Sequence, residues 1–211
     1  MNHRRARERR RGFTRLRAVL AGGLVLGVGA TVTLASWNDS EYASGTFASS
    51  VFDTESNVNG AGYADNSSAP GPTVTFSAPG FSPGVVVYFN VLIRTKANSI
   101  AGTAVLNAGT LSGTDSATLG ANLVYRVVST TGTCAAAAFT GSPAYVVGAA
   151  ATFRALTVGQ ESGVTNTLAA ATASPGAATG FCFEVTLPAG SANSLQGKTA
   201  TATWQFVATS S

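Results

Sequence analysis

Few residues in this chain could carry out nucleophilic, acid–base or zinc chemistry. The 211-residue sequence contains one histidine, His3, and two cysteines, Cys134 and Cys182. The body of the chain after Ala18 therefore has no imidazole, which a Ser-His-Asp or Cys-His site needs as its base. It also lacks the histidine ligands that a zinc protease typically uses. We expect a protein that is not an enzyme and that carries no cofactor.

Carboxylates offer one further route to hydrolytic chemistry. The pairs Asp39/Glu41 and Asp53/Glu55 are each two residues apart, so both members of a pair would project to the same face of a strand. Two facing carboxylates can act as acid and base in glycoside hydrolysis. Solvated acids at the rim of a domain explain these pairs better, and no catalytic residue is predicted.

A calcium site is a weaker possibility in the same region. Oxygen-bearing side chains recur between positions 53 and 65, and a faint resemblance to an EF-hand loop follows from their spacing. Val58 stands where such a loop needs glycine, and no glutamate closes it. A solvated polar loop is the preferred interpretation, so no metal site is predicted; the weak calcium candidates are Asp53, Glu55, Asn57 and Asp65.

Positive charge is concentrated at the N-terminus. Eight of the thirteen lysines and arginines precede Ala18, and the body that follows has five bases against eight acids. A nucleic-acid-binding surface needs a basic patch that neutralises phosphates. The body does not provide one, so no nucleic acid partner is expected.

Residues 1–35 have the layout of an export signal that is cut away. A basic segment leads into the uncharged apolar run Ala18–Ala35. Thr33 and Ala35 then place small side chains at positions −3 and −1 before Ser36, as signal peptidases require. We therefore expect a signal helix over residues 1–35, cleavage before Ser36 by a signal peptidase, and a secreted domain over residues 36–211.

Two alternatives for this leader remain. It could stay as an uncleaved anchor, although an apolar run of about 18 residues with several glycines is short for a bilayer span. Membrane contact is expected only through the uncleaved leader. Arg10-Arg11-Gly12-Phe13 also resembles a twin-arginine signal, so the export route stays open.

Cys134 and Cys182 are predicted to form a disulfide. An even cysteine count in an exported domain is typical of a disulfide bridge, because the environment outside the cytoplasm is oxidising. The bond would close a loop of about 48 residues, worth on the order of 4 kcal/mol in the chain-entropy model. A metal site would need more ligands than two thiols, and a nucleophilic cysteine would lack its base.

The elements that position these residues are predicted to be strands. Beyond Ser36 short β-rich runs alternate with Gly, Pro, Asn and Ser clusters, which is typical of a single all-β sandwich. Phe181, Phe183 and Val185 alternate with Cys182 and Glu184, so Cys182 should face away from the main core. The predicted strands are Gly45–Asp53, Pro72–Ser77, Val85–Thr95, Ser99–Gly109, Leu123–Thr130, Ala144–Val147, Thr152–Val158, Phe181–Leu187 and Thr199–Ala208.

Three groups of segments resemble a known family. They are Trp37-Asn38-Asp39 with Ala43–Phe47, the turn Phe81–Gly84 with Asn90–Ile93 and Ser99–Gly102, and Leu195–Lys198 with Trp204–Thr209. These resemble, in turn, the start of the mature chain, the L-x-P-G turn with its strand pair, and the closing strand of the camelysin/TasA family. Members of that family are exported through a dedicated SipW-type signal peptidase. Residues 107–190, which include both cysteines, match none of the family's patterns.

The resemblance implies a jelly-roll fold and a self-associating surface or biofilm-matrix protein of Gram-positive bacteria. Some relatives form fibres by lending an N-terminal strand to the next subunit, which makes residues 36–52 the candidate donor segment. The family also includes a proposed metalloprotease, an activity that the missing histidines do not support. A secreted monomeric binding module for a glycan or host ligand is the alternative function.

Overall fold

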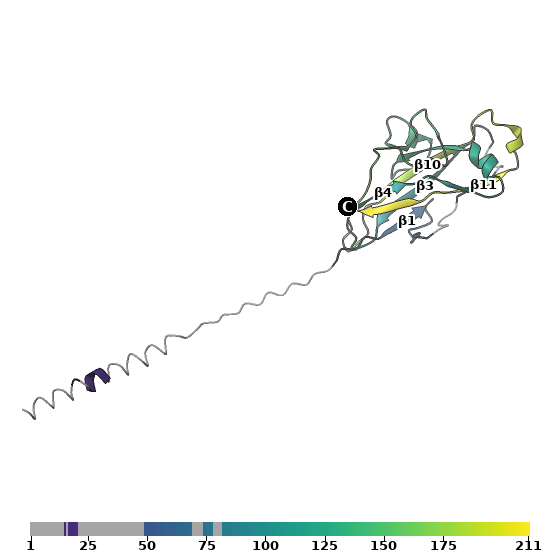
Figure 1. Ribbon diagram of the computed structural model, residues 1–211. Coiled ribbons are helices and arrows are strands. Elements are labelled where there is room, and N and C mark those ends of the chain that lie inside the picture. Colours follow the sequence, from purple (N-terminus) through teal and green to yellow (C-terminus); the bar gives the residue numbers. More distant parts are fainter. Residues whose placement is uncertain (1–14, 16, 21–48, 69–73, 78–81) are drawn as a thin grey trace, which may run out of the picture. The chain divides into compact units, whose positions relative to one another are not determined.

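The computed structural model of the protein describes residues 15, 17–20, 49–68, 74–77 and 82–211 (Figure 1). The chain divides into two compact units, Met1–Phe47 and Ala48–Ser211. In the first unit Arg15 and residues 17–20 are helical. Within the described residues, no helix is long and apolar enough to span a membrane. The predicted cleavage residues Thr33, Ala35 and Ser36 lie outside the described residues.

The second unit is all-β, as the sequence predicted, with antiparallel pairing in every sheet of its described part. Among the described residues, three short helical turns lie between strands: η2 (Ser116–Gly120), η3 (Ala136–Phe139) and η4 (Asn193–Leu195). The strands are β1 (Thr54–Val58), β2 (Val74–Ser77), β3 (Val86–Thr95), β4 (Gly102–Leu106), β5 (Thr110–Ser112), β6 (Val124–Ser129), β7 (Tyr145–Val147), β8 (Arg154–Ala155), β9 (Asn166–Leu168), β10 (Thr179–Thr186), β11 (Thr199–Thr203) and β12 (Phe206–Ser210).

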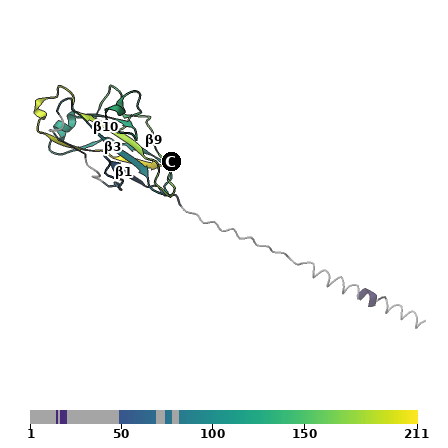
Figure 2. The same cartoon turned by 180° about the vertical axis from the view of Figure 1, so that it is seen from behind.

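The largest sheet has six strands, and β10 lies at its centre. Its order is β1-β3-β10-β6-β7, and β8 also pairs with β6. β10 pairs with β3 along its whole length, from Thr179 opposite Ile93 to Thr186 opposite Val86. Figures 1 and 2 show β3 and β10 side by side from both directions.

The alternation predicted for β10 is confirmed. Phe181, Phe183 and Val185 belong to the main core, whereas Cys182 belongs to a separate cluster on the opposite face. Both faces of the strand are buried, because loops cover the outer face as well. A central strand with two covered faces explains why even Glu184 is only 5% exposed.

Two three-stranded sheets complete the core, in the orders β2-β11-β5 and β12-β4-β9. Their inward residues include Ala104 and Leu106 from β4, and Ala200 and Ala202 from β11. These residues pack in one cluster with the inner face of the six-stranded sheet. The three sheets therefore share a single hydrophobic core.

Several predicted strand boundaries were wrong. The strand expected over Gly45–Asp53 is not formed in its described part: Val51 makes an isolated bridge with Ser99, and the first strand is β1 instead. The sequence predicts a polar loop over the residues of β1, because four of the five are polar, but pairing with β3 supplies the backbone hydrogen bonds of a strand.

The predicted strand Thr199–Ala208 is two strands. β11 and β12 lie in different sheets, and the chain passes from one to the other at Trp204 and Gln205. The sequence alternates without interruption across this point, so it gives no local sign of the change. β5 and β9 were not predicted, because each has three residues of which only one is apolar, whereas the equally short β7 is Tyr-Val-Val.

Candidate functional site

A groove of about 870 Å³ opens beside the core of the second unit. One side is lined by inward residues of β1 and β3, such as Ser56 and Val91. The other side is lined by the chain from Ala202 to Ala208, which contains the passage from β11 to β12. Among the described residues, the groove thus lies between the β1–β3 side of the six-stranded sheet and the β12 sheet.

Aromatic rings form the base of the groove. Phe89 and Phe183 are stacked with their ring centroids 4.4 Å apart, and Trp204 lies 5.7 Å from the Phe89 ring and 5.2 Å from the Phe183 ring. Phe206 packs against Phe181 at 4.6 Å. Phe89 and Phe183 are buried, whereas Trp204 and Phe206 are half-buried and line the groove.

Strand alternation explains why Trp204 and Phe206 lie here. Ala200 and Ala202 face the core in β11, and Trp204 and Phe206 continue the same face of the chain. The alanines allow close packing at the buried end, while the two large rings stand where the chain changes sheets. The sequence pattern showed that these residues share a face, but it could not show that this face ends in an opening.

The β1 side of the groove is held by a short hairpin. Ser56 and Ala64 exchange two backbone hydrogen bonds, each 3.0 Å long. The Asn66 side-chain amide donates to Ser56 Oγ at 2.8 Å, and Asn66, Ser67 and Ser68 line the groove. This hairpin therefore places a hydroxyl- and amide-bearing loop at the rim.

The weak calcium candidates do not gather around one point. Asp53 and Asp65 do converge, but the Lys96 ammonium lies between them and donates to one carboxylate oxygen of each at 2.8 Å. Glu55 instead accepts a 2.7 Å hydrogen bond from Arg94 Nε. The described residues hold no group of three or more acidic, histidine or cysteine side chains that could bind a metal.

The other candidate polar residues do not contribute to a shared site among the described residues. The side-chain oxygen of Asn57 is buried and accepts no hydrogen bond from the described residues. The second acidic pair, Asp39 and Glu41, lies outside the described residues. Lys96 is the ion-pair partner of Asp53 and Asp65 that the sequence pattern missed, because it is 43 residues from Asp53.

The acidic side chains at one wall of the groove are paired with basic side chains. The Lys96 ammonium, with help from the Ser67 side chain and N–H, lowers the pKa of Asp65 to about 2. Arg94 is held under the ring of Tyr63, 3.6 Å from the ring centroid to the guanidinium carbon. Asp53 and Glu55, the acids that line the groove, therefore each have a cation beside them.

Tyr125 packs behind the aromatic base of the groove. The Tyr125 hydroxyl donates to the Val158 carbonyl oxygen, and its ring lies 5.4 Å from that of Trp204. Burial raises the pKa of Tyr125 to about 12. Tyr125 therefore stays a neutral hydrogen-bond donor near neutral pH.

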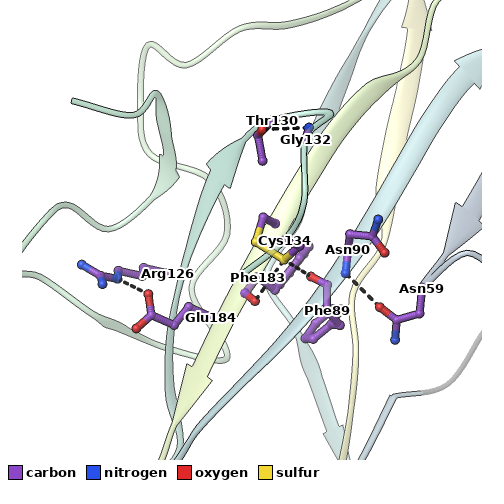
Figure 3. The surroundings of a disulfide bond; sticks show 10 residues. Asn59, Phe89, Asn90, Arg126, Thr130, Gly132, Cys134, Phe183 and Glu184 are labelled. Carbon is purple, nitrogen blue, oxygen red and sulfur yellow. Dashed lines mark hydrogen bonds and ion pairs between the residues drawn. A yellow bond between two sulfur atoms is a disulfide. The ribbon is translucent and has the colours of Figure 1, made fainter. Parts of the chain in front are cut away.

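The predicted disulfide is confirmed on the opposite face of the six-stranded sheet. Cys134 and Cys182 are bonded, with their Cα atoms 5.2 Å apart. Cys134 lies in the loop after β6, and its sulfur is 3.2 Å from the Phe89 carbonyl oxygen (Figure 3). Val128 and Phe139 pack around the bond. A disulfide of this kind indicates an oxidising environment.

No family model matches the chain, and a search of curated proteins finds no match. The resemblance to the camelysin/TasA family therefore rests on the sequence segments alone.

Proposed function

We propose that this protein is a secreted, non-catalytic structural subunit of the cell surface or of a biofilm matrix. Its sheets would form a sandwich of jelly-roll type, and its subunits would associate by adding a strand from one chain to the sheet of another. The observation that carries this proposal is the groove beside β12. The leader and the disulfide support a location outside the cytoplasm.

β12 offers a strand edge at the groove. It pairs with β4 on one side, and none of the described strands pairs with its other side. Unpaired edge strands present a row of backbone donors and acceptors to which another chain can add. Such an edge is a natural site for association between subunits.

An added strand would also cover the groove. Phe206 and Ala208 point from β12 into it, so alternate side chains of a neighbouring strand would reach the same aromatic base. The free energy of association would come from main-chain hydrogen bonds and from further burial of the half-buried Trp204 and Phe206 rings. The edge and the groove therefore support one mode of association.

The structure limits which residues could be donated. Ile100 N–H donates to the Val51 carbonyl oxygen at 2.9 Å, and Phe52 packs against the core of its own unit. Both residues belong to the candidate donor segment 36–52, and both make contacts within their own subunit. We therefore propose that the donated part lies before Val51.

The test compares assembly of two chains that both keep Val51 and Phe52. The chain starting at Ser36 should form large species in size-exclusion chromatography and fibres in electron microscopy. Deleting residues 36–48 should leave a folded monomer, since the described core lies entirely in the second unit.

Replacing residues 36–48 with a glycine–serine segment of equal length is the matched control, and it should also remain monomeric. Assembly of the deletion variant to the same extent would contradict strand donation. A chain from Ser36 that stays monomeric at high concentration would contradict self-association altogether.

A further inference from the structure

The groove has the size and make-up of a small-ligand site. Its volume of about 870 Å³ falls within the roughly 300–1,000 Å³ typical of ligand pockets. Such pockets combine an apolar or aromatic lining with a few polar groups that orient the ligand. Both features are present here.

Trp204 and Phe206 provide an apolar surface that is already in position. Trp204 is packed against the rings of Phe89, Tyr125 and Phe183, and Phe206 against Phe181. Neither ring needs to be ordered when a ligand arrives, which lowers the entropic cost of binding. Flat aromatic surfaces pack well against the apolar faces of ring-shaped ligands.

The rim is rich in uncharged hydrogen-bonding groups. Asn66 and Ser67 line one side, and Asn107, Thr203 and Gln205 line the other. Asn107 Nδ2 donates to Gln205 Oε1 at 3.3 Å, which joins the two amides into one polar surface. Hydroxyl and amide groups both donate and accept hydrogen bonds, as the hydroxyl groups of a ligand require.

Charge selects against ionic ligands. No lysine or arginine lines the described part of the groove, so an anionic ligand finds no counter-charge. The lining acids Asp53 and Glu55 are engaged by Lys96 and Arg94, so a cationic ligand would have to displace an existing ion pair. The chemistry that remains is that of a neutral ligand with both apolar faces and hydroxyl groups.

We propose that the groove binds a neutral oligosaccharide, with Trp204 and Phe206 beneath the sugar rings and the amide rim bonding their hydroxyl groups. This binding does not depend on assembly of the protein. Where the proposed strand addition also holds, a sugar and a neighbouring strand compete for the same groove.

The test measures binding of cellohexaose and chitohexaose by isothermal titration calorimetry. It uses the chain from Ser36 and the variant lacking residues 36–48, so that assembly cannot mask the groove. Saturable binding of at least one of the two sugars to the shorter variant is expected. Absence of binding by both sugars would overturn the proposal.

Two substitutions test whether the sugar binds in this groove. Trp204→Ala should weaken binding by roughly tenfold or more, as loss of a central aromatic contact does. Because Trp204 is also part of the core, Ala108→Trp provides an independent variant: Ala108 is exposed at the groove, and a large ring there should block entry without removing core packing.

Val207→Ala is the matched control, because Val207 is on β12 but 40% exposed and absent from the groove lining. Its affinity should match that of the parent. Sugar binding that survives both Trp204→Ala and Ala108→Trp would overturn the assignment to this groove.

A synthetic peptide covering residues 36–50 separates the two proposals. If the peptide binds and neither sugar does, the groove is a peptide site and the oligosaccharide proposal is wrong, while strand addition is supported. If a sugar binds and the deletion variant still assembles, strand addition is wrong and the oligosaccharide proposal stands.

Discussion

At the scale of single residues, Arg126 belongs to the most buried ion pair that the described residues form. Its Nε donates to Glu184 at 2.7 Å, and the two side chains are only 13% and 6% exposed. The guanidinium carbon lies 4.9 Å from the Phe139 ring centroid and 4.7 Å from that of Phe153. The pair is thus held away from solvent between aromatic rings, and each charge depends on the other.

Replacing Glu184 with alanine should be strongly destabilising. The substitution leaves the Arg126 guanidinium buried without its carboxylate, and such losses cost about 3–5 kcal/mol. Urea denaturation of the purified protein measures the change in the free energy of unfolding. Glu55→Ala, which breaks the more exposed pair with Arg94, should cost clearly less; equal losses would contradict the role of burial.

The pKa of Asp65 gives a second prediction at this scale. It is lowered to about 2 mainly by the Lys96 ammonium, so the carboxylate contributes stability above its ordinary pKa near 3.8. That contribution should be lost as the pH falls from about 4 to about 2. Lys96→Met should raise the pKa of Asp65 toward its ordinary value.

A carbon-13 NMR titration of the Asp65 carboxyl measures this change directly. Lys96→Arg keeps the positive charge and serves as the control, so the pKa of Asp65 should stay low in that variant. A pKa that remains near 2 in Lys96→Met would show that Ser67, whose N–H donates to Asp65 at 3.1 Å, is sufficient alone.

At the scale of elements, the disulfide fixes a loop on the outer face of the six-stranded sheet. Cys182 lies in the central strand β10, and Cys134 lies between β6 and η3. Phe139 of η3 is buried beside the bond and lies 5.9 Å from the ring of Tyr88. The bond therefore connects the loop to the central strand of the six-stranded sheet.

Removing this bond should weaken the whole second unit. Substituting both Cys134 and Cys182 with alanine removes the cross-link between residues 48 positions apart. The chain-entropy model gives a decrease of about 4 kcal/mol in the free energy of unfolding. Urea denaturation of the oxidised parent and of the double variant compares the two free energies of unfolding.

Thiol labelling of the denatured, non-reduced parent provides the control, and it should detect essentially no free cysteine. Labelling of both cysteines would show that the bond is absent from the isolated protein. An unchanged free energy of unfolding in the double variant would show that the bond does not constrain the unfolded chain.

At the scale of the whole molecule, we predict that removal of the leader sets the N-terminus of the secreted chain. We expect the secreted protein to begin at Ser36, because Thr33 and Ala35 place small residues where the peptidase needs them. N-terminal sequencing of secreted material tests this expectation. Ala35→Lys should block cleavage and leave the full-length chain with the cells, whereas Ala35→Ser should be cleaved as before.

A start several residues from Ser36 would contradict the predicted site. Normal secretion of the Ala35→Lys variant with the same N-terminus would contradict the role of Ala35. Either result leaves the oligosaccharide proposal unaffected, because the groove is lined by residues of the second unit.

The sequence by itself determined the fold class, the disulfide and the two faces of β10. Period-two alternation is a local property of a strand, so Phe183 and Cys182 could be assigned to opposite faces without knowing their neighbours. Two cysteines allow only one intramolecular pairing, so the bond between Cys134 and Cys182 needed no further information. Because no histidine follows Ala18, a Ser-His-Asp triad or a histidine-ligated zinc site within the body of this chain was likewise excluded without any knowledge of the fold.

Only the tertiary structure decided where the groove lies and what surrounds it. The groove joins residues as far apart in sequence as Asp53 and Ala208, and the ammonium of Lys96 meets Asp53 across 43 residues. The chain also changes sheets at Trp204, although its alternation continues unbroken. Which strands become neighbours depends on the free energy of packing the whole core, and a pattern of adjacent residues does not contain that information.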